Sequence, residues 1–211
     1  MKAVVLHSGG LDSTLCLLMA KETGRDVVSL GIDYGQRHRI ELEYALSQCH
    51  RYGIERRVLR VEWDKPVRDI PTGRSLDEIR LGVSPAFLPA RNAVFLTLAC
   101  AEATGVGAEE VWIGVNAIDF SGYPDCLPEF IDSFRTMINA AVPCGPQVVA
   151  PLIEMSKPTI AAEARRLGLA PGDTWSCYQP RFTNQGISPC GQCDACILHD
   201  HAWQEADRKK T

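Results

Sequence analysis

The sequence predicts an α/β fold: a parallel sheet of about five strands with helices on both faces, followed by a small cysteine-rich segment. Short apolar runs of strand length alternate with longer segments of helical periodicity. The chain has 211 residues, 45% hydrophobic and 23% charged, which is enough to bury the core of one such domain. Polar, proline-containing segments separate the runs, so each apolar run reads as a buried parallel strand.

The first third of the chain indicates strand-helix units. The expected elements are, in order, a strand at residues 3–6, a helix at 12–22, a strand at 27–31, a helix at 40–52 and a strand at 57–61. The two helices end beside Gly24 and Gly53, and a glycine just past a helix end is the usual C-terminal stop. Residues 64–90 interrupt this alternation with four prolines and two glycines, and a loop of this length is often a functional lid.

The alternation then resumes and ends near residue 172. We expect a helix at residues 93–104, a strand at 111–115, a helix at 128–141, a strand at 148–150 and a helix at 158–167. After Asp173 aromatic, proline, glycine and cysteine residues dominate. We therefore expect an α/β domain over residues 1–172, with the cysteine-rich residues 173–211 packed on it.

The composition of the chain argues against nucleic-acid binding, a membrane span and a disulfide framework. A net charge of −4 and a pI of about 5.7 argue against a surface for long phosphate backbones, so no nucleic acid is expected. We expect no membrane span and no signal peptide, and hence a cytoplasmic protein. Nine cysteines in a reducing compartment are unlike a disulfide framework and need another explanation.

The segment after the first strand favours phosphate binding. Its sequence, Ser8-Gly9-Gly10-Leu11-Asp12-Ser13-Thr14, offers close backbone approach, hydroxyl donors and a helix N-terminus. The Gly-Lys-Ser/Thr of a P-loop and the third glycine of a dinucleotide fingerprint are absent. Asp12 either caps the helix or holds Mg²⁺ near the phosphates, and the alternative for the whole segment is a tight turn before a capped helix.

That string resembles the PP-loop of ATP pyrophosphatases. The resemblance implies that ATP is split between its α- and β-phosphates. An oxygen of the substrate would become an adenylate, and a nucleophile would then displace AMP.

The C-terminal cysteines predict a metal site. Cys190, Cys193 and Cys196 are closely spaced, and Cys177 is the first choice for a fourth ligand, with His199 and His201 in reserve. Four protein ligands would make a closed, structural zinc site. An iron–sulfur cluster can use similar spacing, although bacterial ferredoxin spacing would require a cysteine at position 200.

Residues 119–126 follow a predicted strand and so fall at the sheet edge where ligands bind. Their carboxylates and aromatic rings suit a planar heterocycle, and the alternative is a surface turn. Arg91 either binds phosphate or begins a helix. Lys157 either stabilises charge on the reacting oxygen or is a solvated lysine.

These strings, with residues 31–38 and 176–178, resemble the 7-cyano-7-deazaguanine synthase family over nearly the whole chain and in the same order. The resemblance implies a homodimer that makes a nitrile from 7-carboxy-7-deazaguanine, ammonia and ATP, with adenylated acid and amide intermediates, in queuosine biosynthesis. Phe120 and His199 depart from the family pattern, which more often has tyrosine and arginine there. This weakens any donor role for Phe120 and leaves His199 without a family role.

The site residues expected from the pattern and the resemblance fall into four groups. Those for ATP are His7, Ser8, Gly9, Gly10, Leu11, Asp12, Ser13, Thr14, Leu15, Cys16, Leu17 and Arg91. Candidates for catalysis are Asp12, Lys157, Asp119 and Asp125, and those for the heterocycle are Asp119, Phe120, Tyr123 and Asp125. One structural Zn²⁺ per chain is expected on Cys177, Cys190, Cys193 and Cys196. The competing hypotheses are a PP-loop tRNA-modifying enzyme of the sulfurtransferase type and a nucleotide-binding relative without turnover.

Overall fold

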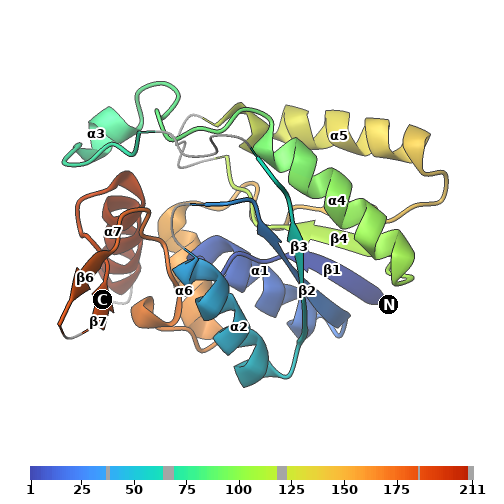
Figure 1. The fold of residues 1–211 in the computed structure, drawn as a ribbon, viewed down its shortest axis with the longest axis horizontal. Coiled ribbons are helices and arrows are strands. Elements are labelled where there is room, and N and C mark those ends of the chain that lie inside the picture. The colour runs from blue at the N-terminus through green and yellow to red at the C-terminus, as the bar shows by residue number, and fades with distance from the viewer. Residues whose placement is uncertain (37–38, 64–68, 118–122, 185, 209–211) are drawn as a thin grey trace.

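The computed structural model describes residues 1–36, 39–63, 69–117, 123–184 and 186–208. Its centre is a parallel sheet with the strand order β3-β2-β1-β4-β5 (Figure 1). The strands are β1 (Lys2–Leu6), β2 (Asp26–Asp33), β3 (Glu55–Arg60), β4 (Glu110–Ile113) and β5 (Gln147–Val149). All four pairings are parallel, so the predicted five-stranded parallel sheet is confirmed.

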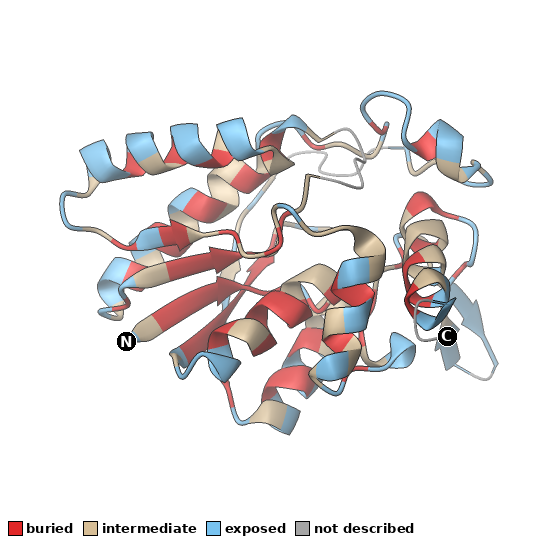
Figure 2. Ribbon diagram, turned by 180° about the vertical axis from the view of Figure 1, so that it is seen from behind, coloured by how far each residue is buried: buried red, intermediate tan, exposed pale blue. Residues whose placement is uncertain are grey.

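Helices cover both faces of the sheet, as predicted. One face packs against α1 (Leu11–Glu22) and α2 (Ile40–Tyr52), while α6 (Lys157–Arg166) packs on α1 and α7 (Asp194–Arg208) packs on α6. The other packs against α4 (Arg91–Gly105) and α5 (Pro128–Ala141). In Figure 2 the central strands and the inward sides of the helices are red because they are buried. Burial on both faces explains the almost unbroken apolar run of β2, since parallel strands have no solvated side.

The sheet order puts two strand ends beside each other where the ligand is expected. From β1 the chain first adds β2 and β3 on one side, and then crosses to the opposite side to add β4 and β5. The carboxyl ends of β1 and β4 therefore lie together at the point where the direction of winding reverses. In open α/β sheets this is where ligands bind.

The proline-rich segment is bonded to the cysteine-rich segment through contacts between residues 73–74 and residues 192–194. The short helix α3 (Leu76–Ile79) begins with a capping box at Ser75. The amide of Gly73 donates to the carbonyl of Gln192 at 2.8 Å, and Arg74 forms an ion pair with the buried Asp194 of α7. The predicted loop is thus anchored on the C-terminal segment.

The C-terminal segment also contains elements that periodicity did not predict. They are the helix α7, the 3₁₀ turn η2 (Pro171–Asp173) and a small antiparallel hairpin of β6 (Arg181–Thr183) and β7 (Gly186–Ser188). A second 3₁₀ turn, η1 (Pro124–Cys126), precedes α5. None of the helices in the described ranges has both the length and the apolarity that crossing a bilayer requires.

Candidate active site

The loop after β1 has the geometry of an anion-binding turn. Gly9 has φ +95°, and a β-carbon there would collide with the carbonyl oxygen of Glu41 and lie 2.8 Å from the amide nitrogen of Ala45. Only glycine lets this loop pack so closely on α2. Gly10 is the N-cap of α1 and has no side-chain cap, so the first amides of the helix remain available to a ligand.

Hydroxyl groups reinforce this turn. The Ser8 and Ser13 hydroxyl oxygens are 3.1 Å apart, and the amide of Gly10 donates to the Ser8 hydroxyl at 3.3 Å. These groups hold the loop open with its donors at one edge of the cavity, which suits a phosphate group.

A buried neutral histidine fixes the loop from below. His7 is 1% exposed, and its ring contacts the side chains of Ser29, at 2.9 Å, and Gln48, at 2.9 Å. Gln48 in turn donates to the carbonyl of Gly9 at 3.3 Å. Burial, with a smaller contribution from Arg56, lowers the pKa of His7 to about 3, so the ring is uncharged at neutral pH.

Asp12 is a ligand candidate rather than a cap. Its carboxylate forms an ion pair with Lys157 and accepts from the Asn116 amide at 3.3 Å. Its other oxygen, Oδ1, is buried and has no hydrogen-bond partner within the described residues. Lys157 lies in the first turn of α6, so two distant helix starts bring these groups together. An unpartnered carboxylate oxygen beside a phosphate-binding loop fits a Mg²⁺ ligand.

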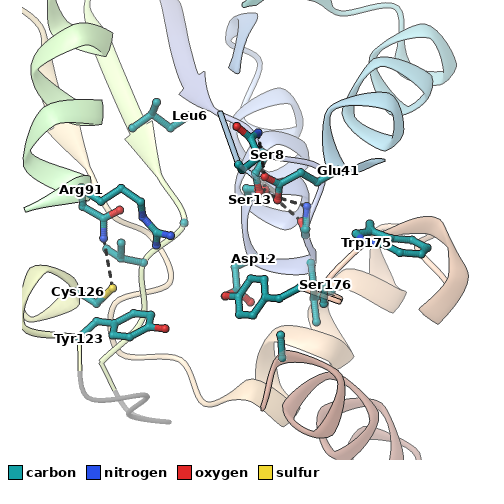
Figure 3. Close-up of a pocket in the computed structure, with 18 of the residues that line it drawn as sticks. Leu6, Ser8, Asp12, Ser13, Glu41, Arg91, Tyr123, Cys126, Trp175 and Ser176 are labelled. Carbon is teal, nitrogen blue, oxygen red and sulfur yellow. Dashed lines mark hydrogen bonds between the residues drawn. The ribbon is translucent and has the colours of Figure 1, made fainter. Parts of the chain in front are cut away.

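A cavity of about 400 Å³ lies in front of the loop. Figure 3 shows Ser8, Ser13 and Glu41 on one side of it, Arg91 and Tyr123 on the other, and Asp12 between them. The predicted ATP residues that line it are His7, Ser8, Gly10, Leu11, Asp12, Ser13 and Arg91, and Lys157 and Tyr123 also line it. Those predicted for ATP that do not line it are Gly9, Thr14, Leu15, Cys16 and Leu17. The last three are fully buried in the core of α1.

The wall opposite the loop is aromatic and positively charged. Tyr34 packs on Phe95 with ring centroids 5.3 Å apart, and Tyr123 stacks on Phe87 at 5.2 Å. Arg91 begins α4 directly after Ala90, whose φ of 60° is unusual for a residue with a β-carbon. Rings of this kind suit a planar heterocycle, and the guanidinium suits a carboxylate or phosphate.

Glu41 is a cavity residue that the sequence did not single out. It lies in the first turn of α2, and its carboxylate accepts from the Gln36 amide at 3.2 Å. Burial raises its pKa to about 7, although the neighbouring Arg91 acts in the opposite direction. A carboxylate that accepts N–H groups and titrates near neutrality is a functional candidate. No local sequence feature indicates its position, because that depends on the packing of α2 against Gly9.

The segment predicted for the heterocycle is only partly placed. Asp119 and Phe120 lie outside the described residues. Tyr123 lines the cavity, whereas Asp125 does not. Asp125 is 6% exposed and accepts from the backbone amide of Asn92 at 3.0 Å, so it supports the N-terminus of α4, and through it Arg91, from behind.

The four C-terminal cysteines form a metal-binding group. The sulfur atoms of Cys177, Cys190, Cys193 and Cys196 all lie within 4.8 Å of one another, and all four residues are buried. The Cys190 and Cys196 sulfurs are 3.9 Å apart. With Zn–S bonds near 2.3 Å, a tetrahedral site requires sulfurs about 3.8 Å apart, so the donor set fits one tetrahedral ion. Backbone amides stabilise the sulfurs, for example Cys190 N–H to the Cys177 sulfur at 3.2 Å.

The two histidines considered as alternative metal ligands, His199 and His201, do not belong to the four-cysteine group. His199 contacts the Ser176 hydroxyl at 3.1 Å and the Pro171 carbonyl at 3.2 Å. His201 is not part of the metal-binding group found among the described residues.

The chain is similar in sequence to proteins of one family. The family described as "Queuosine biosynthesis protein QueC" matches residues 2–207. A protein of Rhodopseudomonas palustris (strain HaA2) named 7-cyano-7-deazaguanine synthase 2 is 57% identical over 97% of this chain and 97% of its own length.

Solved structures share the fold at low sequence identity. The U34-tRNA thiolase NcsA from Methanococcus maripaludis, solved with its 4Fe-4S cluster, has a TM-score of 0.51 and 15% identity, covering 100% of this chain and 66% of that one. The NH3-dependent NAD synthetase from Campylobacter jejuni has a TM-score of 0.50 and 18% identity, covering 82% of this chain and 66% of that one. At such identities the likeness shows the fold alone.

Proposed function

The chain belongs to the QueC family of queuosine biosynthesis, and from this membership we propose that it is an ATP-dependent carbon–nitrogen ligase that converts 7-carboxy-7-deazaguanine and ammonia to 7-cyano-7-deazaguanine. One structural observation carries the proposal. A single cavity brings together an anion-binding loop, an Asp12–Lys157 pair and an aromatic wall with Arg91. These are the groups needed to hold a triphosphate beside a planar acid.

The triphosphate is proposed to lie on the loop of residues 8–13. Amides of the first turn of α1 and the serine hydroxyls donate to phosphate oxygens. Asp12 would hold Mg²⁺ through its unpartnered oxygen, and the ion would neutralise charge on the departing pyrophosphate. Lys157 would stabilise charge at the α-phosphate, because it reaches Asp12 from the start of α6.

The deazaguanine is proposed to lie against the aromatic wall. Its guanine-like edge carries neighbouring N–H donors, and the Glu41 carboxylate can accept two of them at once. Arg91 would orient the carboxylate of the substrate toward the α-phosphate. Tyr123 would pack on the ring, and Asp119 and Phe120, outside the described residues, stay candidates for the same subsite.

The chemistry proceeds in two adenylations. The substrate carboxylate attacks the α-phosphorus and releases pyrophosphate, which turns a poor leaving group into AMP. Ammonia attacks the acyl carbon, AMP leaves with the former carboxylate oxygen, and a proton is lost to give the amide. A second ATP adenylates the amide oxygen, and loss of AMP and a proton leaves the nitrile. The protein mainly orients reactants and stabilises charge, and the anchored segment of residues 69–90 would help exclude water.

The cysteine group is proposed to hold one structural zinc ion per chain. All four positions are protein thiolates, so the ion would have no open position for substrate and would instead fix the C-terminal segment. A four-iron cluster places irons and sulfides between its thiolates and would need them farther apart than the observed group allows. This spacing favours zinc over the iron–sulfur alternative.

We propose a cytoplasmic homodimer that does not bind nucleic acid, with an ATP-binding domain at residues 1–172 and the zinc-binding segment at residues 173–211. The acidic net charge of −4 supports the absence of a nucleic-acid surface and disfavours a tRNA-modifying enzyme.

A product assay tests the function. The protein is incubated with 7-carboxy-7-deazaguanine, ATP, Mg²⁺ and ammonium, and the products are identified by mass spectrometry. Formation of AMP with the amide and nitrile is the expected result. ATP binding without AMP would support the nucleotide-binding relative without turnover, and sulfur transfer to tRNA with iron in the protein would support the sulfurtransferase.

A further inference from the structure

A second cavity adjoins the catalytic one. Its volume is about 360 Å³, and Trp175, Ser176, Cys177 and His199 line both cavities. The two spaces therefore share a wall made of residues 175–177 and one residue of α7. Figure 3 shows Trp175 and Ser176 at the side of the catalytic cavity that this wall forms.

The lining of the second cavity includes exposed residues, which mark its outer part, and buried residues, which mark its inner end. Exposed residues, among them Gly172 and Asp200, line its outer part. At the inner end Thr174 is only 6% exposed, and its hydroxyl is buried without a hydrogen-bond partner in the described part of the chain. An unsatisfied buried hydroxyl points to a small polar ligand at this position, because leaving it unpaired is unfavourable.

The wall itself contains an oriented hydrogen-bond pair. The Pro171 carbonyl can only accept, so the 3.2 Å contact assigns the proton of the neutral His199 ring to Nε2. Nδ1 must then accept, and the Ser176 hydroxyl donates to it at 3.1 Å. The lone pairs of the Ser176 oxygen remain free to accept N–H groups where Ser176 lines the catalytic cavity.

We propose that this second cavity is the entrance through which ammonia reaches the adenylated substrate. This inference rests on the proposed function. The Asp200 carboxylate at the outer part attracts ammonium, and the ion leaves one proton with water there, because a charged ammonium is costly to desolvate. Neutral ammonia passes the Thr174 and Ser176 hydroxyls and attacks the acyl carbon. A carbon–nitrogen bond forms, the carbon–oxygen bond to AMP breaks, and the attacking nitrogen releases one proton.

A separate entrance would let ammonia reach the adenylate while the main cavity is occupied by the reactants and closed to water. The nucleotide and the deazaguanine would both occupy the main cavity and its mouth, and the nucleophile must arrive while they are bound. The site must also exclude water, which would hydrolyse the adenylate. A narrow polar side entrance admits ammonia while the main mouth is filled.

The test blocks the outer part at Gly172. Gly172 lines the second cavity, a β-carbon there meets no atom within 4 Å and the residue has no positive φ, so Gly172→Leu adds a bulky side chain to the lining without distorting the backbone. Gly172→Ala is the matched control. We expect Gly172→Leu to raise the KM for ammonium by roughly tenfold, the equivalent of about 1.4 kcal/mol. The KM for ATP and the pyrophosphate exchange that depends on the carboxylic acid should stay unchanged in both variants.

Ser176→Ala provides a second, independent readout. Removing the hydroxyl should raise the KM for ammonium with little change in exchange, because adenylation precedes the arrival of ammonia. Thermal unfolding and metal content check that each variant is folded. An unchanged KM for ammonium in both Gly172→Leu and Ser176→Ala, with exchange intact, would overturn the entrance alone. Absence of acid-dependent exchange in the unmodified protein would instead overturn the proposed function.

Discussion

The packing of the anion-binding loop on α2 predicts a sharp difference between two adjacent glycines. In Gly9→Ala the new methyl group would require φ +95° of an alanine, and left-handed backbone costs a residue with a β-carbon about 1–2 kcal/mol. It would also collide with the carbonyl oxygen of Glu41 and approach the amide nitrogen of Ala45 to 2.8 Å, so α2 would have to move. Together these effects should exceed about 3 kcal/mol, comparable to other severe steric substitutions.

Gly10→Ala is the matched control for that variant. Gly10 has φ −77°, and its β-carbon would meet the nearest atoms at 3.5 Å, an ordinary contact distance. Replacing an N-cap glycine with alanine should therefore cost less than about 1 kcal/mol. Its effect should fall on phosphate binding, because the methyl group would stand where the α1 amides face the ligand.

Thermal unfolding followed by circular dichroism measures the difference. A loss of about 3 kcal/mol in a chain of this size should lower the Tm of Gly9→Ala by about 6–12 °C. Acid-dependent pyrophosphate exchange should also fall in this variant, because moving the start of α2 displaces the Glu41 carboxylate from the cavity. If Gly9→Ala unfolds at the same temperature as Gly10→Ala, the proposed contact between loop and α2 is wrong.

Four further predictions concern the cavity and the metal site. Lys157→Ala should lower kcat about 10²–10³-fold with little change in Tm, as expected when a group that stabilises transition-state charge is lost, and a change confined to KM would contradict that role. Glu41 must be ionised to accept two N–H groups, so the KM for the carboxylic acid should fall as pH rises through about 7, and Glu41→Gln should abolish this dependence. Stability should change with pH in the opposite direction to substrate binding. Because the folded protein holds the Glu41 proton more tightly than the unfolded chain, the free energy of unfolding should decrease as pH rises from 4.5 through about 7, and a flat profile would refute the burial of Glu41. Cys193→Ala should abolish stoichiometric zinc, measured by atomic emission, and destabilise the C-terminal segment, whereas zinc retained at one ion per chain would argue against the four-cysteine site.

The sheet could be predicted because its strands are short apolar runs between clear stops. All five expected strands are present, with shifted ends. The edge strand β3 begins two residues earlier than expected because Glu55 and Arg56 pair with Val28 and Ser29 despite their polarity. Hydrogen bonding, rather than hydrophobicity, sets the end of an edge strand.

The residues of the candidate active site could be predicted only where they belong to a recognisable sequence motif. The loop string located Ser8, Ser13 and Asp12, but nothing local to Glu41 shows that α2 packs on Gly9 and brings this carboxylate into the cavity. Nor does the sequence show that Asp125 turns away to hold the start of α4. Both placements depend on contacts between distant segments, which periodicity and spacing do not report.

The C-terminal segment escaped prediction for a related reason. Its hairpin and the attachment of residues 73–74 are organised around the four cysteines rather than around a periodic apolar face. Once a metal site replaces a hydrophobic core, the pattern that normally reveals secondary structure is weak. The cysteine spacing predicted the metal group but not the path of the chain around it.

Transfer of labelled oxygen tests adenylation of the substrate directly, because an oxygen of the substrate must bond to the α-phosphorus of ATP. The protein is supplied with 7-carboxy-7-deazaguanine whose carboxylate carries ¹⁸O, and AMP is analysed by mass spectrometry. We expect each AMP formed to carry one heavy oxygen and the nitrile to retain none. Unlabelled AMP, or release of ADP and inorganic phosphate in its place, would contradict adenylation of the substrate.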